Sequence, residues 1–419
     1  MPQEPVIEAL IVSRHEQPPQ SAALLRALAA AGLGTGEFEP PPAGTEIVPP
    51  APGSRKRLGT YTLAVAGTAA RVRMVVWRYG SPVTEGMGDA ALNGLARDLS
   101  PDDATTLRTG TTSLDLRQAA TAALRPLAAL DFALKVTHVV LDQTDGVCID
   151  PAAQRALGRA QFAQLTAGDP LAHVSVHDEA WDADARWLHT HGMQKFARAE
   201  LDLVGVPVSL ELEARALLRD VAISLIGGAE LAAGDEVDLG DAGMAEVVAV
   251  AADVDHLAPF GRLRLVDSAR EGARADETAA RLLARVALAE AVRRLQQGDR
   301  AGASEIIERV LAADPDECGA LALQARLRLA AGQALAALDV SEYMQLRVPD
   351  DYRGPLVAGL ALAALGRYRE ARAALDRSLR LNPEAAESFA ARASVLERLG
   401  DPRRAEEDRA HARYLGYRA

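Results

Sequence analysis

A repeat of 34 residues runs through the last third of the sequence. Three residue types keep this period at fixed mutual offsets: Gly298, Gly332, Gly366 and Gly400; Ala303, Ala337, Ala371 and Ala405; Pro315, Pro349 and Pro383. Such self-similarity marks one structural unit that occurs several times. A chain with this period stacks its units in a row, because each unit buries its apolar face against its neighbours.

Each recurring residue has a physical role in a pair of antiparallel helices. The glycine adopts the left-handed backbone that closes the first helix without a Cβ clash. The alanine fits where two helices cross closely, and the proline ends the second helix because it has no backbone N–H. Apolar residues recur at helical spacing between these marks, as at Ile306, Ile307 and Val310. The period therefore predicts four helix pairs that form a solenoid.

The repeat segment, about 281–417, resembles the tetratricopeptide repeat superfamily, with units at 284–317, 318–351, 352–385 and 386–419. The resemblance implies a concave groove that is lined by first helices and holds segments of partner proteins. Mapped onto this chain, the partner-binding groove consists of Arg285, Leu288, Val292, Arg326, Arg353, Leu356 and Leu360.

The residues of this groove argue against one known variety of the superfamily. The carboxylate clamp needs Lys and Asn at several places where this chain has Leu288, Val292 and Ala322. The resemblance thus implies an apolar groove with arginines and no binding of chaperone tails. Two interpretations stay open: the groove binds a partner protein, or it docks the N-terminal domain of the same chain.

Charge is unevenly distributed along the chain. The total is 46 Lys and Arg against 58 Asp and Glu, a formal net charge of −12. Residues 279–419 contain 22 Arg, no Lys and 20 acidic residues, which leaves a net −14 on the first 278 residues. An acidic front half repels a phosphate backbone, and arginines interleaved with acids are typical of solvated helix faces. We therefore expect no nucleic-acid partner.

Residues 1–267 predict an acidic α+β domain of unknown function, followed by a short linker at 268–278 and the repeat domain at 279–419. Apolar alternation predicts strands near 6–12, 58–67, 69–80, 111–116, 174–178, 186–190 and 199–205, with three more between 235 and 266. Helical spacing predicts helices near 21–31, 89–98, 117–131, 151–165 and 211–226. Residues 138–150 suggest a strand, an Asp-Gly turn and a strand. A strand–helix–strand–strand order that occurs twice suggests duplicated ferredoxin-like units.

One stretch of the front half, 186–207, is rich in polar side chains. It contains His189-Thr190-His191-Gly192-Met193, followed by Phe196 and Glu200-Leu201. This resembles an uncharacterised bacterial α+β family with a His-Thr-x-Gly-Met/Leu signature followed by Phe and Glu. The resemblance extends over much of 5–230 and implies a fold without a known chemistry.

Two interpretations of this stretch stay open. His189, His191 and Glu200, with His173, His177 and Asp202 near them in sequence, form a candidate catalytic or metal cluster, since i and i+2 on a strand share a face. In the other interpretation, these polar residues satisfy backbone groups at the turn after the strand. The sequence has no Gly-x-Ser-x-Gly elbow, phosphate-binding loop or His-Glu-x-x-His helix, and we expect no cofactor and no metal.

Taken together, these features favour a non-enzymatic, cytoplasmic bacterial protein that acts by protein–protein interaction. Two distant cysteines suit a reducing compartment, and no apolar run reaches the roughly 18 residues of a membrane span. One alternative is a hydrolase or metal-dependent enzyme that uses His189, His191 and Glu200. Another is a neutralising partner of a toxin or effector, since an acidic domain suits a basic nuclease. The partner and the oligomeric state stay open.

Overall fold

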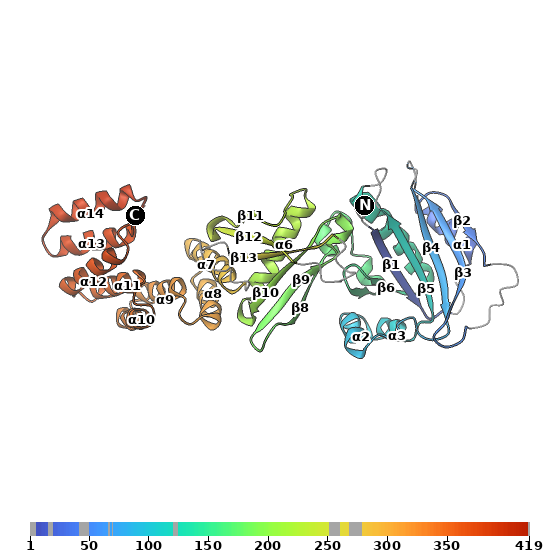
Figure 1. Cartoon of the computed structure of the whole chain (residues 1–419), viewed down its shortest axis with the longest axis horizontal. Coiled ribbons are helices and arrows are strands. Elements are labelled where there is room, and N and C mark those ends of the chain that lie inside the picture. The colour runs from blue at the N-terminus through green and yellow to red at the C-terminus, as the bar shows by residue number, and fades with distance from the viewer. Residues whose placement is uncertain are drawn as a thin grey trace.

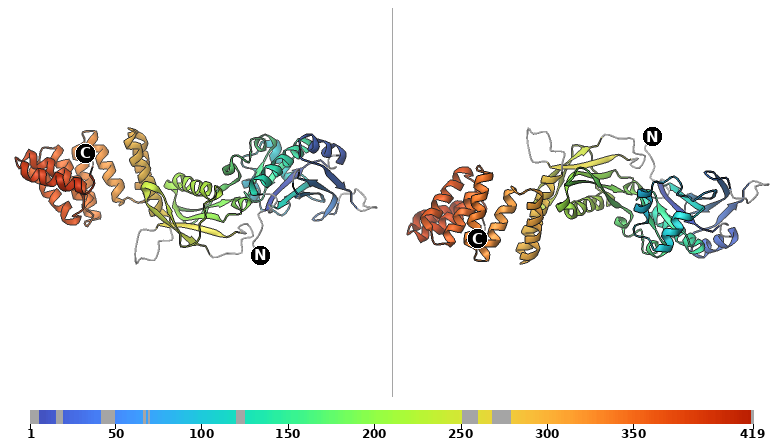
Figure 2. Two further views of the ribbon diagram at one scale, coloured as in Figure 1. Left: turned by 90° about the horizontal axis from the view of Figure 1, so that it is seen from above. Right: turned by 90° about the horizontal axis from the view of Figure 1, so that it is seen from below.

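The computed structural model describes residues 6–15, 20–41, 50–65, 68, 70–119, 125–250, 260–267 and 279–417. The molecule is elongated, and its two sheet-containing parts and a stack of helices lie in a row along the long axis (Figures 1 and 2). A sheet-rich region followed by a helical repeat region is the predicted order. The predicted linker at 268–278 lies outside the described residues.

The first part contains a seven-stranded sheet in the order β2-β3-β4-β5-β1-β6-β7, whose neighbouring strands pair antiparallel. Its strands are β1 (Val6–Ser13), β2 (Gly36–Glu39), β3 (Arg55–Ala64), β4 (Arg71–Tyr79), β5 (Thr112–Ala119), β6 (Val147–Asp150) and β7 (Arg155–Leu157). Its helices are α1 (Ser21–Ala30), α2 (Asp89–Ala96), α3 (Pro101–Thr109), α4 (Pro126–Thr144) and α5 (Arg159–Phe162).

Helices cover both faces of this sheet. Consecutive residues of a strand point to opposite sides, and the strands of this sheet bury apolar residues on both. Ile11 of β1 belongs to the core formed with α1 and α4. The next residue, Val12, packs with Leu107 of α3 in a smaller core on the other face. The apolar run that predicted β1 thus reflects a strand buried on both sides.

The second part contains a six-stranded sheet in the order β11-β12-β13-β10-β9-β8. Its strands are β8 (Ser175–Ala180), β9 (Ala185–His191), β10 (Glu200–Pro207), β11 (Glu236–Asp238), β12 (Met244–Ala249) and β13 (Arg262–Asp267). Two antiparallel three-stranded units meet at the parallel pair β10 and β13, and α6 (Glu211–Ile226) connects them in sequence. Short 3-10 turns are η1 (Pro170–His173), η2 (Met193–Phe196), η3 (Val208–Leu210) and η4 (Gly240–Ala242). The two sheets differ in strand order, and the ferredoxin-like duplication is not confirmed.

Three predictions between 117 and 165 are wrong over part of their length. Residues 117–119 belong to β5, and the helix starts only at Pro126. Residues 138–144, predicted as a strand, are the last turns of α4, whose buried β-branched residues gave an apolar run. Asp145, with φ 45°, ends this helix in the left-handed conformation, so the Asp-Gly pair is a helix end and not a hairpin turn. The predicted helix at 151–165 contains strand β7 and the single turn α5.

Eight helices fill residues 279–417, all of which are described. They are α7 (Ala280–Gln296), α8 (Arg300–Ala313), α9 (Cys318–Ala330), α10 (Ala334–Arg347), α11 (Arg353–Ala364), α12 (Tyr368–Leu381), α13 (Ala386–Arg398) and α14 (Pro402–Tyr414). The second helix of each pair starts 34 residues after the second helix of the preceding pair. Helices that are neighbours in sequence pack against each other.

The roles predicted for the recurring residues are confirmed. The four glycines follow the first helices with φ between 76° and 85°. The four alanines are 0% exposed in the second helices. Each of the three prolines stands two residues after the end of a second helix.

Candidate functional site

An open groove of about 750 Å³ runs along the first helices of the repeat. We call it the repeat groove. The structure brings all seven sequence-predicted groove residues into its lining: Arg285, Leu288, Val292, Arg326, Arg353, Leu356 and Leu360. Asp241 and Ala242, from η4 of the second sheet region, line it as well. These two residues were not found from the sequence, because η4 lies far from the repeat along the chain.

The floor of the repeat groove is apolar, but its leucines are not equally accessible. Val292 is 39% exposed, whereas Leu356 is only 4% exposed and packs into the core around α11. Leu288 and Leu360 lie between these extremes. The accessible apolar surface is therefore offered mainly by Val292, Leu288 and Leu360.

The three arginines of the repeat groove have carboxylate partners within the chain. Arg353 binds Asp351 through Nε and Nη2, at 2.9 and 2.6 Å, and this contact raises its pKa. Arg326 of α9 forms an ion pair with Glu387 of α13. Both members of that pair are partly exposed, at 44% and 32% of the side chain. An exposed ion pair of this kind contributes at most about 1 kcal/mol to stability.

Arg285 fastens the first repeat unit to the second sheet. Its guanidinium donates to the carbonyl oxygens of Ala242 and Met244, at 2.6 and 2.7 Å, and to Asp267 Oδ1 at 2.6 Å. The backbone N–H of Ala279 also donates to the carbonyl of Val204 in β10. Arg285 therefore lies at the end of the repeat groove that is closed by the chain itself.

Glu200 organises the turn after β9 and does not join the histidines. It is 1% exposed, and its two oxygens accept from Thr190 Oγ1 at 2.7 Å and from the Gly192 N–H at 3.0 Å. Burial raises the pKa of Glu200 to about 7, against the hydrogen bonds from Thr190 and Gly192, which lower it. Gly192 has φ 111°, and a Cβ there would lie 2.4 Å from the carbonyl oxygen of His173.

The segment after this turn fastens the two sheets together. Lys195 is 1% exposed, and its Nζ donates to Asp150 Oδ2 at 2.6 Å and to the carbonyl of His173 at 3.1 Å. Asp150 ends strand β6 of the first sheet, whereas Met193 packs in the core of the second. Phe196 packs in the core of the first sheet. We call this region, residues 150–155, 172–177 and 192–200, the sheet joint.

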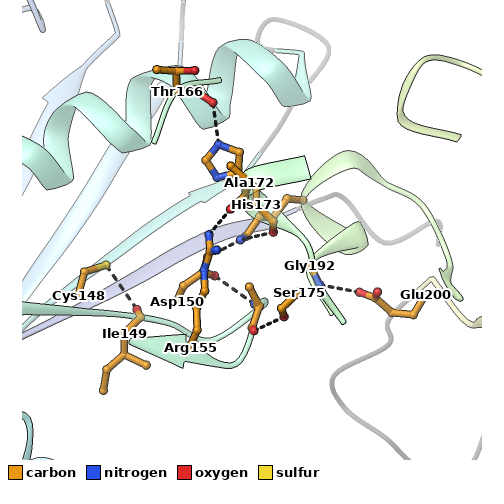
Figure 3. Close-up of polar contacts among 12 residues, drawn as sticks. Cys148, Ile149, Asp150, Arg155, Thr166, Ala172, His173, Ser175, Gly192 and Glu200 are labelled. Carbon is orange, nitrogen blue, oxygen red and sulfur yellow. Dashed lines mark hydrogen bonds and ion pairs between the residues drawn. The ribbon is translucent and has the colours of Figure 1, made fainter. Parts of the chain in front are cut away.

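Backbone contacts of the sheet joint are made by several other side chains. Arg155 donates to the carbonyl of Ala172 at 2.5 Å, and Ser175 Oγ donates to that of Ala153 at 2.5 Å. Figure 3 shows Asp150, Arg155, Ala172, His173 and Ser175 gathered in one place, with Glu200 directed to Gly192. Burial lowers the pKa of the Lys195 ammonium, and the contact with Asp150 opposes this shift.

The structure does bring three histidines together. The ring of His191 lies 4.9 Å from that of His177 and 4.8 Å from that of His189. His189 is 3% exposed, its Nδ1 has no hydrogen-bond partner among the described residues, and burial lowers its pKa to about 3. His191 Nδ1 lies 3.4 Å from Gln154 Nε2. Within the described ranges, no group of three or more His, Cys, Asp or Glu residues is arranged to hold a metal ion.

Sequence reasoning did not find the pair of Asp150 and Lys195, which lie 45 positions apart. One signal was present, because Lys195 is one of only three lysines in a chain that otherwise uses arginine. An ammonium group is a compact point charge on a flexible stem, and here it donates to one carboxylate and one carbonyl oxygen.

Several solved structures of helical-repeat proteins match the repeat region of this chain. No family model and no curated protein match the chain. A thermophilic TPR protein of Thermus thermophilus, TTC0263, is 26% identical, over 32% of this chain and 74% of that one, with a TM-score of 0.30. MamA of Desulfovibrio magneticus RS-1 is 21% identical, over 32% and 75%, with a TM-score of 0.26. MamA of AMB-1 is 23% identical, over 32% and 78%, with a TM-score of 0.25.

The description of the C-terminal third as a helical repeat rests on its own eight helices and their 34-residue spacing. In the part of the chain that the structure describes, no helix combines the length and the apolar character that crossing a membrane requires.

Proposed function

We propose that the protein is a non-enzymatic interaction protein whose repeat groove binds a segment of a partner protein. One observation carries the proposal: the seven positions that the superfamily resemblance assigns to partner binding line a single open groove of about 750 Å³. Grooves of this size, with an apolar floor and a few polar groups, are typical of ligand sites.

The first repeat unit has a docking role as well. Arg285 bonds to Ala242, Met244 and Asp267, and α7 packs on the core of the second sheet. These contacts support a division of the repeat, in which the start of α7 anchors the solenoid and the rest of the groove, from Leu288 onwards, holds the partner. Strand β13 ends at Asp267 and helix α7 begins at Ala280. These positions support the proposed boundary between a front domain, 1–267, and a repeat domain, 279–419.

The charge of the front half narrows the class of partner. Its net −14 favours a protein over a nucleic acid, and neutralisation of a basic toxin or effector is one form that such binding would take. A cytoplasmic location is proposed on the two buried cysteines, Cys148 and Cys318, which are free thiols. The catalytic alternative at His189, His191 and Glu200 is not favoured, because the Glu200 carboxylate bonds to Thr190 and Gly192.

The test is affinity capture from a lysate of the organism that encodes the protein, with quantitative mass spectrometry. The variant carries Val292→Asp and Leu360→Asp, since Leu356 is too buried to change without loss of packing. We expect the double variant to lose about tenfold or more of its specific partner, as when a buried apolar anchor is replaced by a charge.

The control is Leu346→Asp, because Leu346 is 80% exposed on α10 and does not line the repeat groove. Its recovery of the partner should equal that of the parent protein. Equal recovery by the double variant, at equal helical content, would refute binding in the repeat groove.

A further inference from the structure

A second pocket continues the repeat groove towards the last helix. It has a volume of about 650 Å³ and is lined by residues of α11, α12, α13 and α14 and by Tyr417. We call it the terminal pocket. Leu360 and Glu387 belong to the lining of both the terminal pocket and the repeat groove. The two hollows are therefore neighbours on one concave surface.

The ion pair between Arg326 and Glu387 stands at the border of the two hollows. Arg326 lies on α9 and Glu387 on α13, whereas α11 packs between these two helices. The pair thus links the second unit to the fourth. Because both side chains are partly exposed, a charged group of a ligand can compete for either member.

The terminal pocket is predominantly basic. Its lining contains Arg398, Arg409 and Arg413, against Glu387 as the one carboxylate in the lining. Arg413 pairs with Glu406, and Arg409 pairs with Glu397 and Glu406. These two arginines are held by carboxylates that lie outside the pocket lining.

Arg398 differs from the other two arginines. Its Nε donates to the hydroxyl oxygen of Tyr368 at 3.1 Å, and its guanidinium carbon lies 5.3 Å from the centre of that ring. No carboxylate of the described residues lies within ion-pair distance of Arg398. A guanidinium that is positioned by an aromatic ring keeps most of its N–H donors for an anion.

Small apolar residues form the floor beside this guanidinium. Ala363, Ala390, Ala391 and Val395 line the pocket, and their short side chains leave the volume open. The terminal pocket thus offers apolar surface and an available positive charge side by side. An apolar side chain next to a carboxylate in one ligand matches both features.

We propose that the terminal pocket and the repeat groove together bind an acidic protein segment that carries leucine-like side chains. One apolar side chain enters the terminal pocket, and the neighbouring carboxylate binds Arg398. A second carboxylate displaces Glu387 from Arg326 where the two hollows meet. This inference rests on the proposed function, and it adds the charge and side-chain class of the partner.

The test uses the full chain and two fluorescent probes with acetylated and amidated ends. One probe alternates leucine and glutamate over ten residues, and the other has lysine at each glutamate position. We expect fluorescence anisotropy to give about tenfold or more tighter binding of the glutamate probe, the effect of a charge-assisted hydrogen bond. Equal or tighter binding of the lysine probe would overturn the proposal.

Two substitutions are expected to change the affinity for the glutamate probe in opposite directions. Arg398→Gln should weaken it about tenfold, since it removes the available guanidinium. Glu387→Gln should strengthen it about threefold or more, since it removes the competitor for Arg326, and a gain of affinity cannot come from misfolding. The control is Arg403→Gln, at a side chain that is 89% exposed and outside the pocket. A loss of affinity in Glu387→Gln, or no effect of Arg398→Gln, would contradict the proposal.

The experiment separates this inference from the proposed function. If neither probe binds but the groove variant Val292→Asp with Leu360→Asp still loses its partner from the lysate, the acidic segment is wrong and groove binding stands. If the protein forms a dimer in light scattering that Arg398→Gln dissociates, while neither probe binds, the occupant is a second copy of the chain and the proposal is overturned.

Discussion

The sheet joint and the repeat groove both contain ion pairs, but in opposite surroundings. Lys195 and Asp150 are enclosed, with side-chain exposures of 2% and 11%, whereas Arg326 and Glu387 are exposed by 44% and 32%. An enclosed pair cannot exchange partners without leaving a charge in an apolar medium, so it fixes structure. A half-exposed pair exchanges partners at little cost, so it suits recognition. Burial therefore distinguishes the ion pairs that hold this molecule together from those that are available to a ligand.

The largest effect is expected from breaking the enclosed pair. Lys195→Met leaves the Asp150 carboxylate with the Arg155 guanidinium, 3.6 Å away, and the Ala153 N–H, and should destabilise the front half by about 3 kcal/mol or more. All three tryptophans lie in the front half, so their fluorescence in a urea titration reports on this part alone. Lys135→Met is the control, because that ammonium is 59% exposed, and it should change stability by less than about 0.5 kcal/mol.

A pH-dependent effect of similar size is expected at Glu200. Its pKa in the folded state, about 7, lies above the ordinary value of 4.5. Between pH 4.5 and 7 the folded state therefore keeps a proton that the unfolded state has released. The contribution of Glu200 is therefore greatest below pH 4.5 and falls as the pH rises to 7, by up to about 3 kcal/mol. Glu200→Gln should remove this contribution, so the stability of the parent protein minus that of the variant should fall as the pH rises, as measured by urea titrations at pH 4.5, 5.5, 6.5 and 7.5.

His189 is expected to give the opposite slope. Its pKa of about 3 lies below the ordinary 6.5, so its contribution is present above pH 6.5 and is lost as the pH falls to 3. The two slopes oppose each other between pH 4.5 and 6.5. His189→Gln should therefore expose the decline in stability caused by Glu200. If stability still rises with pH in this variant, His189 is not the source of the rise. His173 and His177 are then the other candidates, because burial lowers their pKa values as well. The triple variant decides between these two cases.

A smaller effect is expected at the turn glycine of the sheet joint. Gly192→Ala places a Cβ 2.4 Å from the carbonyl oxygen of His173 at φ 111° and should cost about 2 kcal/mol or more. Gly228→Ala is the matched control, since Gly228 has φ 114° and nothing within 4 Å of the added Cβ. It measures the backbone strain alone, about 1 kcal/mol. Equal losses in the two variants would show that the contact with His173 does not matter.

The smallest effect on stability is expected in the repeat groove. Arg326→Gln should change the free energy of unfolding by less than about 1 kcal/mol, as measured by the circular dichroism of the helices. Arg392→Gln sharpens the comparison, because Arg392 is 22% exposed and binds both Asp376 and Asp408 within the solenoid. It should cost more than Arg326→Gln, and the reverse order would break the distinction between enclosed and exchangeable pairs.

The sequence predicted the repeat more accurately than the front half, for a physical reason. Contacts within a helical repeat are local, so Gly332, Ala337 and Pro349 reveal the helix ends and crossings directly. The sheets depend on contacts between distant segments, such as that of Asp150 with Lys195, which no local pattern reveals. The buried valines of α4 likewise gave an apolar run that periodicity alone does not assign to a helix or a strand.

The candidate sites show the same contrast between the repeat and the front half. The groove positions came from a repeat register that holds over four units, and the structure places them side by side. The rings of His189 and His191, which the strand spacing put on one face, lie 4.8 Å apart. The direction of Glu200 could not be inferred, because it depends on the positive φ of Gly192 and on the following 3-10 turn.

The shared core of the second sheet and the first repeat unit affects how the chain can be divided. Ala279, Leu282 and Leu283 lie in one apolar cluster with Leu203 of β10 and Leu265 of β13. A fragment cut at residue 279 would leave this leucine surface open to water and prone to self-association. The second sheet and the first repeat unit thus share one core, so separating them would expose apolar surface on both sides of the cut.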